Sequence, residues 1–334
     1  MTKIKLIAPE DNSVISFTTE VQKAYHSAPE RLIPHPADPE PRKTDDTIPV
    51  GAVFAFEADA ECELQISEYE DFREYLSFSG KNEFKVSNLL HGRKYFWQVK
   101  CGGQSSEKRS FTVAMDLPRW INIPDVTNVR DIGGWKTSSG REIRQGMVFR
   151  GGQFEGWTNQ SHRSAITEEG RRVFLDELKI HTEIDLRGEG KGQVFDVPDY
   201  QKIPIEAYAT WNDNGIFAPE QMDNVRKIFE LFADEKTYPL YFHCQGGGDR
   251  TGTIAFLLEA VLGMDYNDMI TDYEMTNLSV SGERNRYSEV WTKFIEKLAT
   301  FAPEKSVYDQ TAAFLNQCGI KDDVLEKIRT ILLF

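Results

Sequence analysis

Residues 240–252 have the sequence LYFHCQGGGDRTG, and this stretch decides the fold of the chain around it. A short apolar run ends at Phe242, three glycines follow, and residues 253–262 have a helix-like composition. A strand, a tight glycine turn and a helix N-terminus in this order bring backbone N–H groups together at one point, where the helix dipole adds partial positive charge. The stretch therefore predicts a loop that binds a phosphate group.

Two side chains in this loop suit chemistry on a phosphate. The positive field favours the thiolate form of Cys244, which would make this residue a nucleophile. Arg250, six positions later, can donate two N–H bonds from one planar fork to phosphate oxygens. The alternative is a buried structural cysteine beside a glycine turn. Four neighbouring residues weigh against it: His243, Gly247, Thr251 and Gly252.

The pattern of His-Cys, five residues and Arg-Thr-Gly resembles the signature of the cysteine-dependent phosphatases, the protein tyrosine phosphatase superfamily. Upstream, NVRDIGG at residues 128–134 and IDLR at residues 184–187 resemble phrases of a bacterial branch of tyrosine/serine phosphatases, some of which act on phosphoinositides. The three matches occur in the same order as in that branch and cover roughly residues 120–280.

The resemblance implies roles for individual residues. Substrate binding would fall to the loop residues Gln245, Gly246, Gly247, Gly248, Thr251 and Gly252. Support of the loop would fall to His243, Asn128, Arg130 and Asp131. Thr251 would either donate a hydrogen bond to the Cys244 sulfur or cap the following helix. Arg187 would either reach the phosphate pocket and bind substrate, or form an ion pair with Glu189 or Asp185.

Protonation of the leaving oxygen requires an acid, and two aspartates are candidates. Residues 210–216, TWNDNGI, resemble the Trp-Pro-Asp loop of protein tyrosine phosphatases, with Asn212 in place of the proline. This resemblance implies that Asp213 is the general acid, on a loop that closes over substrate. A solvent-facing Asx turn is the alternative. Asp249, inside the phosphate loop, is either the acid itself or a carboxylate that orients Arg250.

The loop departs from the related sequences at Gly248, where relatives commonly have lysine. The glycine removes one cation beside the phosphate, and substrates with several phosphates usually draw on such cations. Gly248 therefore favours singly phosphorylated substrates.

Residues 1–115 are expected to form a small all-β sandwich, because short strand-like runs recur between turn signals at about 8–12-residue spacing. Residues 89–99 resemble the late strands of fibronectin type III-like domains. Residues 22–49 are rich in proline and are expected to form a long loop, either mobile or laid along the second domain. Cys62 and Cys101 lie in strand-like runs and could pair, but we expect free buried thiols.

Residues 116–334 alternate strand and helix patterns, which predicts an α/β domain with a central, mostly parallel sheet flanked by helices, as in the cysteine phosphatases. Ligands of such sheets bind at the C-terminal ends of the strands. Strands are expected at residues 182–187, 204–208 and 240–243. Helices are expected at residues 167–178, with Thr167 as N-cap, and at residues 219–233, 253–262 and 324–333.

Composition limits the partners of this chain. Its net charge of −14 argues against nucleic acid, and it has no apolar run long enough for a transmembrane helix. The six histidines are scattered without ligand spacing, so we expect no metal and no cofactor. Acidic residues follow the N-terminus too soon for a signal peptide, which favours a cytoplasmic location. A trimmed N-terminus would leave a secreted or periplasmic location open.

These observations together predict a phosphomonoester hydrolase that forms a phosphocysteine intermediate. Its substrate would be a phosphotyrosine or phosphoserine protein, or a small phosphomonoester, and its product would be inorganic phosphate. An inositol-phosphate or phosphoinositide phosphatase with the same chemistry is the first alternative, and a non-catalytic phosphate-binding module is the second. The N-terminal domain would be an accessory module that shapes the mouth of the active site or binds a protein partner.

Overall fold

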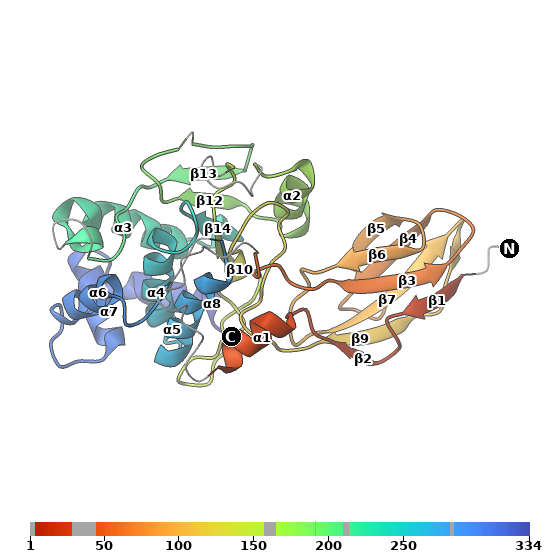
Figure 1. Ribbon diagram of the computed structural model, residues 1–334, viewed down its shortest axis with the longest axis horizontal. Helices are drawn as coiled ribbons and strands as arrows, with labels where there is room; N and C mark the ends of the chain where they lie inside the picture. Colours follow the sequence, from red (N-terminus) through yellow and green to blue (C-terminus); the bar gives the residue numbers. More distant parts are fainter. Residues whose placement is uncertain (1–3, 29–44, 157–164, 191, 210–213, 281–283) are drawn as a thin grey trace, which may run out of the picture. The chain divides into compact units, whose positions relative to one another are not determined.

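The computed structural model describes residues 4–28, 45–156, 165–190, 192–209, 214–280 and 284–334 (Figure 1). The chain divides into two compact units. The first comprises residues 1–20 and 49–121, and the second comprises residues 21–48 and 122–334. Among the described residues, no helix combines the length and the apolar character needed to cross a membrane.

The first unit consists of two β-sheets that share a core. One sheet has the strand order β1 (Lys5–Ala8), β3 (Ala52–Glu57), β6 (Glu83–Val86). The other has the order β2 (Ser13–Ile15), β9 (Arg109–Val113), β7 (Lys94–Cys101), β4 (Cys62–Ser67), β5 (Leu76–Gly80), with β8 (Gln104–Ser105) paired to β7. Phe54 of the first sheet makes edge-to-face contacts with Trp97 and Phe111 of the second, at centroid distances of 5.3 and 5.4 Å. These three buried rings join the inner faces of the sheets.

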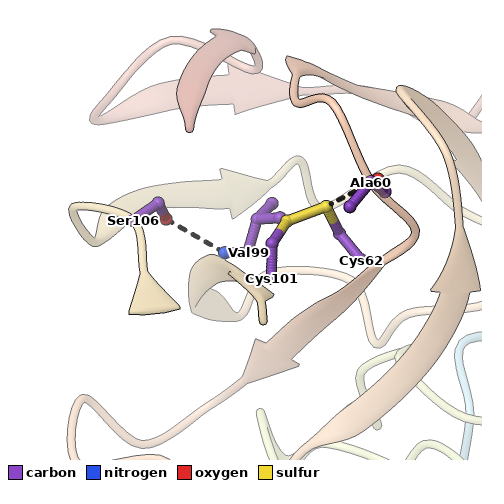
Figure 2. The surroundings of a disulfide bond; sticks show 5 residues. All are labelled: Ala60, Cys62, Val99, Cys101 and Ser106. Carbon is purple, nitrogen blue, oxygen red and sulfur yellow. Dashed lines mark hydrogen bonds between the residues drawn. A yellow bond between two sulfur atoms is a disulfide. The ribbon is translucent and has the colours of Figure 1, made fainter. Parts of the chain in front are cut away.

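A disulfide joins Cys62 and Cys101, so the prediction of two free thiols is wrong (Figure 2). The pairing follows from strand register. Antiparallel strands β4 and β7 place Glu63 opposite Lys100, and the next pair outward is Cys62 and Cys101. Their Cα atoms are 4.5 Å apart, the separation of a non-hydrogen-bonded antiparallel pair. Sequence patterns located both strands but did not give the register between them.

The second unit is a mixed α/β structure around a five-stranded sheet. The strand order is β10 (Arg130–Asp131), β11 (Val148–Gly151), β14 (Leu240–His243), β12 (Thr182–Asp185), β13 (Asp199–Lys202). Only β10 is antiparallel to its neighbour. All four residues of the central strand β14 are buried, and both its neighbours are parallel, so its C-terminal end lies in the middle of the sheet edge.

The principal helices of this unit are α1 (Glu20–Ser27), α2 (Glu168–Arg172), α3 (Pro219–Phe232), α4 (Arg250–Leu262), α5 (Tyr266–Glu274), α6 (Glu289–Ala299), α7 (Val307–Gln317) and α8 (Asp322–Leu332). Helix α4 follows the predicted phosphate loop and packs against α5, α7 and α8 (Figure 1). Twelve of its thirteen residues are buried, which suits its mean apolar composition. It is therefore the central helix of the unit.

Several expected elements are present with small shifts in their ends. Strand β14 has the expected bounds, and Thr167 caps α2 by accepting a hydrogen bond from the N–H of Gly170. Helix α2 continues as a π-helical turn over Val173–Glu177, which extends the helical segment to the predicted length. Helices α3, α4 and α8 also lie where they were predicted.

Two predictions of local structure are wrong. The strand expected at residues 204–208 lies earlier, at β13, and residues 203–207 are outside any strand. Pro204 has no N–H to donate to a ladder, which explains why the strand ends before it. The expected loop at residues 22–49 begins as helix α1, since residues 20–27 contain neither proline nor glycine. Residues 29–44 of that expected loop lie outside the described residues.

We predict that the Cys62–Cys101 disulfide stabilises the first unit. It closes a sequence separation of 39 residues, for which chain-entropy estimates give about 3–4 kcal/mol. The double variant Cys62→Ala, Cys101→Ala should therefore unfold at lower urea concentration than the oxidised parent. A reductant should shift the parent towards the variant and leave the variant unchanged. Equal midpoints for parent and variant under oxidising conditions would contradict the prediction.

Candidate active site

The predicted phosphate loop lies between the end of β14 and the start of α4. Cys244 directly follows the strand and is 3% exposed. Gly247 has a φ of +70°, and a Cβ atom on it would lie 2.6 Å from the carbonyl of Gly151. Only glycine fits there, because both the backbone conformation and the close approach to β11 exclude a side chain. The loop thus rests directly on the end of the neighbouring strand.

Five consecutive carbonyl groups of the loop accept hydrogen bonds from groups around and behind it. The donors, in order from residue 245 to residue 249, are Gln153 N (3.1 Å), Asn128 Nδ2 (3.0 Å), Arg150 Nη2 (3.0 Å), Gly252 N (3.1 Å) and Thr253 N (2.8 Å). In a trans peptide, the C=O and the following N–H point in opposite directions. Fixing these carbonyls outward therefore turns the N–H groups of residues 246–250 towards the other side, where they can converge on an anion.

The donors Asn128 and Arg150 are themselves held by one buried carboxylate, Asp272. Arg130 Nε donates to Asp272 at 2.7 Å, and Arg150 Nη1 also donates to it. Arg130 Nη1 donates to Asn128 Oδ1 at 2.6 Å, which orients the Asn128 amide towards Gly246. Two relays therefore connect Asp272 to neighbouring loop carbonyls, one through Arg150 and one through Arg130 and Asn128.

The two buried carboxyl groups of this cluster, Asp272 and Glu259, have pKa values shifted in opposite directions. Burial opposes ionisation of Asp272, but the charges of Arg130 and Arg150 hold its pKa below the ordinary value. Burial, with the charge of Arg150, lowers the pKa of Arg130 to about 10, so it stays protonated at neutral pH. Burial and the charge of Asp272 raise the pKa of Glu259 well above its usual range. Glu259 therefore remains neutral beside an ionised aspartate flanked by two arginines.

Asp131 was expected to support the loop, and its contacts are with turns beside the sheet. Its Oδ1 accepts from Gly133 N at 2.7 Å, and its Oδ2 accepts from Gly146 N at 2.6 Å. It thereby joins the segment after β10 to the segment before β11. Its effect on the loop passes through the position of these strands.

Arg250 points its guanidinium at a carboxylate from the loop after β12. Glu189 accepts from Nη1 and Nη2 of Arg250 at 3.0 and 2.6 Å. This contact lowers the pKa of Glu189, with the Arg250 hydrogen bond as its largest cause. Glu189 was considered as a partner of Arg187, but it pairs with the arginine of the phosphate loop instead.

Arg187 forms the other ion pair that was considered, the one with Asp185. Its Nε and Nη2 each donate to Asp185 at 2.8 Å. Its Nη1 donates to Glu155 at 2.6 Å and to Gln153 at 2.8 Å. Every guanidinium nitrogen is therefore engaged with protein, and Gln153 in turn supplies an N–H to the loop.

His243 lies between a buried carboxylate and the start of the loop. Its Nε2 is 3.0 Å from Glu183 Oε1, and its Nδ1 is 3.2 Å from the carbonyl oxygen of Cys244. Its ring stacks on Tyr241 and packs on Phe154, at centroid distances of 5.6 and 5.2 Å. These contacts fix the imidazole below the loop, where it can position the backbone of Cys244.

The two candidate acids differ in what the structure describes. Asp213 lies outside the described residues. The described residues that flank it are joined by a bond from Ile216 N to Tyr208 O at 2.8 Å. The Tyr208 hydroxyl donates to Asp249 Oδ1 at 2.8 Å, and Arg284 Nη2 donates to Asp249 Oδ2 at 2.6 Å. Both oxygens of Asp249 therefore accept hydrogen bonds within the protein.

Thr251 is fully buried, and within the described part of the chain its Oγ1 has no hydrogen-bond partner. The N-cap position of α4 is Asp249, so Thr251 does not cap the helix. A bond from Thr251 to the Cys244 sulfur stays a prediction. Gly252 follows, and a Cβ there would lie 3.3 Å from Tyr273 and 3.4 Å from Arg150. The start of α4 is thus packed tightly on the residues that support the loop.

The site is therefore a cysteine and an arginine on a loop whose carbonyls are held by hydrogen bonds, at the C-terminal edge of a mostly parallel sheet. A family model described as "Tyrosine phosphatase family" matches residues 121–334. The chain belongs to this family.

Individual relatives are more distant. A protein of Cupriavidus necator that is named as a tyrosine-protein phosphatase is 26% identical over 178 residues, which is 46% of this chain and 61% of that protein. Two solved structures are each 14% identical to this chain: the core catalytic domain of the PP-IP phosphatase Siw14 from S. cerevisiae in complex with citrate, and the Siw14 catalytic core. They cover 46% and 55% of this chain, and 86% and 85% of their own, with TM-scores of 0.32 and 0.31. At these TM-scores the two solved structures support no inference about this chain.

Sequence reasoning missed most of the partners that hold the loop. Arg150 had a signal, because it directly follows the apolar run of β11 towards the expected sheet edge. Asp272 and Glu183 had none, since each lies in an ordinary helix or strand pattern far from the loop in sequence. Their roles depend on which buried charges meet in three dimensions.

We predict that Asp272→Asn destabilises the second unit by about 3–5 kcal/mol, because it leaves two buried arginines without their carboxylate. Urea unfolding at neutral pH measures this loss. Asp223→Asn is a matched control, since Asp223 is exposed on α3 and also pairs with an arginine, and it should change stability little. Similar midpoints for the two variants would contradict the role given to Asp272.

We also predict a change in pH dependence for Glu259→Gln. A carboxyl whose pKa is raised by folding contributes stability that falls as pH rises above its unfolded value, about 4.3. Glutamine cannot ionise, so the stability of the variant relative to the parent should increase with pH through this window. Urea unfolding at several pH values tests the sign. Parallel stability curves for parent and variant would refute it, and Glu326→Gln, exposed on α8, serves as the control.

Proposed function

We propose that this chain is a cysteine-dependent phosphomonoester hydrolase that acts as a protein tyrosine, or dual tyrosine/serine, phosphatase. The observation that carries the proposal is the loop of residues 244–250. Five of its carbonyls are held outward, which turns its N–H groups to the opposite side, between a buried cysteine and an arginine in the sequence. Family membership supports the reaction class. The preference for tyrosine or serine substrates rests on the sequence resemblance.

The reaction proceeds through two displacements at phosphorus. The Cys244 thiolate attacks in line, so the S–P bond forms as the bond to the leaving oxygen breaks. Arg250 and the N–H groups of the loop bind the equatorial oxygens, where charge must be stabilised. A water molecule then attacks the phosphocysteine and releases inorganic phosphate, and the thiolate is restored. The Oγ1 of Thr251 can donate to the departing sulfur in this second step.

We assign the general acid to Asp213 and an orienting role to Asp249. The flanks of Asp213 are anchored at the loop, because Tyr208 binds both Ile216 and Asp249. Asp249 accepts from Tyr208 and Arg284 with its two oxygens, which suits a carboxylate that orders its surroundings more than one that gives up a proton. Asp213 would protonate the leaving group and later take a proton from the attacking water.

Arg187 and Glu189 complete the proposed site as positioning residues. Arg187 is engaged by Asp185, Glu155 and Gln153, so it supports the loop through Gln153 rather than binding substrate. Glu189 holds Arg250 by its two terminal nitrogens and so fixes the direction of its fork.

We propose that the first unit is a fibronectin type III-like sandwich and that the chain comprises an accessory domain, residues 1–115, and a phosphatase domain, residues 116–334. The hydroxyl of Tyr95, near the start of β7, accepts from Leu90 N at 2.9 Å. Such a bond from a tyrosine at the start of a late strand to the backbone shortly before it is typical of immunoglobulin-like sandwiches. A protein partner is the role we propose for this domain.

The proposed function predicts specific kinetics with p-nitrophenyl phosphate in EDTA across pH. The parent should turn over, Cys244→Ser should be inactive, and Cys318→Ala should retain activity, since Cys318 is the other free cysteine and lies at the C-terminal end of α7, outside the loop. Asp213→Asn should remove the fall in rate at high pH, because that fall reports deprotonation of the acid. Asp249→Asn should keep it.

Two outcomes would overturn parts of this scheme. Loss of the basic limb in Asp249→Asn, and not in Asp213→Asn, would exchange the roles of the two aspartates. A silent parent whose Cys244 is still protected from alkylation by phosphate would replace the enzyme with a phosphate-binding module.

A further inference from the structure

The guanidinium of Arg284 lies against the phosphate loop at Gly248. A Cβ atom on Gly248 would lie 2.9 Å from both Nε and Nη2 of Arg284. The same Nη2 donates to Asp249 Oδ2 at 2.6 Å. The side chain of Arg284 is 17% exposed, so part of it remains within reach of solvent. An arginine from outside the loop thus occupies the space that a side chain at residue 248 would take.

Several contacts fix Arg284 in this place. Asn277, which is buried, accepts a hydrogen bond from Arg284 N and donates to Arg284 O at 2.6 Å. The Asn277 amide also donates to the hydroxyl of Tyr25 on helix α1 at 2.6 Å. Tyr25 in turn donates to the carbonyl of Glu274 at 3.1 Å. Helix α1 therefore belongs to the scaffold that presents Arg284 to the loop.

Arg284 stays charged in this position. Burial alone would lower its pKa, but the charge of Asp249 and the hydroxyl oxygens of Tyr208 and Tyr273 raise it above the ordinary value. Its side chain pairs with the Asp249 carboxylate. The loop has no lysine of its own, and Arg284 places a cation beside Gly248.

We propose that Arg284 is a substrate-binding residue that takes a second phosphate group, carried by the substrate next to the phosphate that is removed. Its guanidinium approaches from the side on which a side chain at residue 248 would project, beside the ring of N–H groups rather than within it. A planar guanidinium binds phosphate oxygens through paired N–H bonds. Gly248 then leaves the space that the Arg284 guanidinium occupies. The absence of a lysine at residue 248 therefore does not reduce the positive charge of the site. The inference rests on the proposed phosphatase function and specifies its substrate class.

The test compares an inositol monophosphate with an inositol bisphosphate whose phosphates are on adjacent carbons. Arg284→Gln should lower kcat/KM for the bisphosphate by roughly 10- to 100-fold, mainly through KM, the loss expected for a charge-assisted contact. The monophosphate and p-nitrophenyl phosphate should change by less than about 3-fold. Arg284→Lys should restore part of the preference. Arg286→Gln is the matched control, since Arg286 is two residues away and pairs with Glu274.

Gly248→Ala provides an independent variant that keeps the arginine. A Cβ at residue 248 would displace the guanidinium by its close contact, so this variant should also lose preference for the bisphosphate. If Arg284 only orients Asp249, then Arg284→Gln and Asp249→Asn should lower kcat alike for all three substrates. That result would overturn the inference. Equal losses for the mono- and bisphosphate in Gly248→Ala would do the same.

A binding measurement separates this inference from the proposed function. Calorimetry on Cys244→Ser should show that pyrophosphate binds more tightly than inorganic phosphate, and that Arg284→Gln in the same background removes most of the difference. If the parent turns over no substrate but this preference exists and depends on Arg284, the phosphatase function fails and the second anion site stands. If the parent turns over substrate without any such preference, the second anion site fails alone.

Discussion

The buried carboxylate of Asp272 is the interaction on which the site depends. Between Arg130 and Arg150 it neutralises charge where water cannot, and it fixes the direction of both guanidinium groups. Arg150 holds the carbonyl of Gly247, and Asn128, oriented by Arg130, holds the carbonyl of Gly246. Without these bonds, the glycines of the loop would leave its backbone free. The backbone conformation of the loop is thus fixed by a buried charge cluster behind it.

A second series of hydrogen bonds connects helix α1 to the loop. It begins at Tyr25 on α1, passes through the Asn277 amide to Arg284, and ends at Asp249 and Gly248. Asp249 continues it to Tyr208 and so to the flanks of residues 210–213. Helix α1 therefore contributes to the site, although in sequence it lies between the two parts of the first unit.

The sequence was sufficient for several elements that a short local pattern encodes, although it misplaced one strand and missed helix α1. The glycine loop, strand β14, helix α4 and the cap at Thr167 all follow from composition over a few residues. It failed where a contact depends on register or on buried charge. The Cys62–Cys101 pair required the alignment of two strands, Glu189 required knowing which arginine it faces, and Asp272 lies in a helix whose pattern reveals only burial. Sequence reasoning at Gly248 could not include Arg284, which lies against this glycine but is 36 positions away in sequence (284 − 248).

The disulfide in the first unit gives this chain two opposed requirements for its redox surroundings. In the proposed reaction Cys244 must stay reduced, and oxidation to a sulfinic or sulfonic acid would remove this nucleophile irreversibly. The bond between Cys62 and Cys101 must stay oxidised to stabilise the pairing of β4 with β7. Both of its cysteines are at most 4% exposed, which shields the sulfurs from attack by an external thiolate. A free Cys244 and an intact Cys62–Cys101 disulfide can therefore coexist over an intermediate range of thiol concentration. Below that range Cys244 would be exposed to oxidation, and above it the disulfide would be reduced.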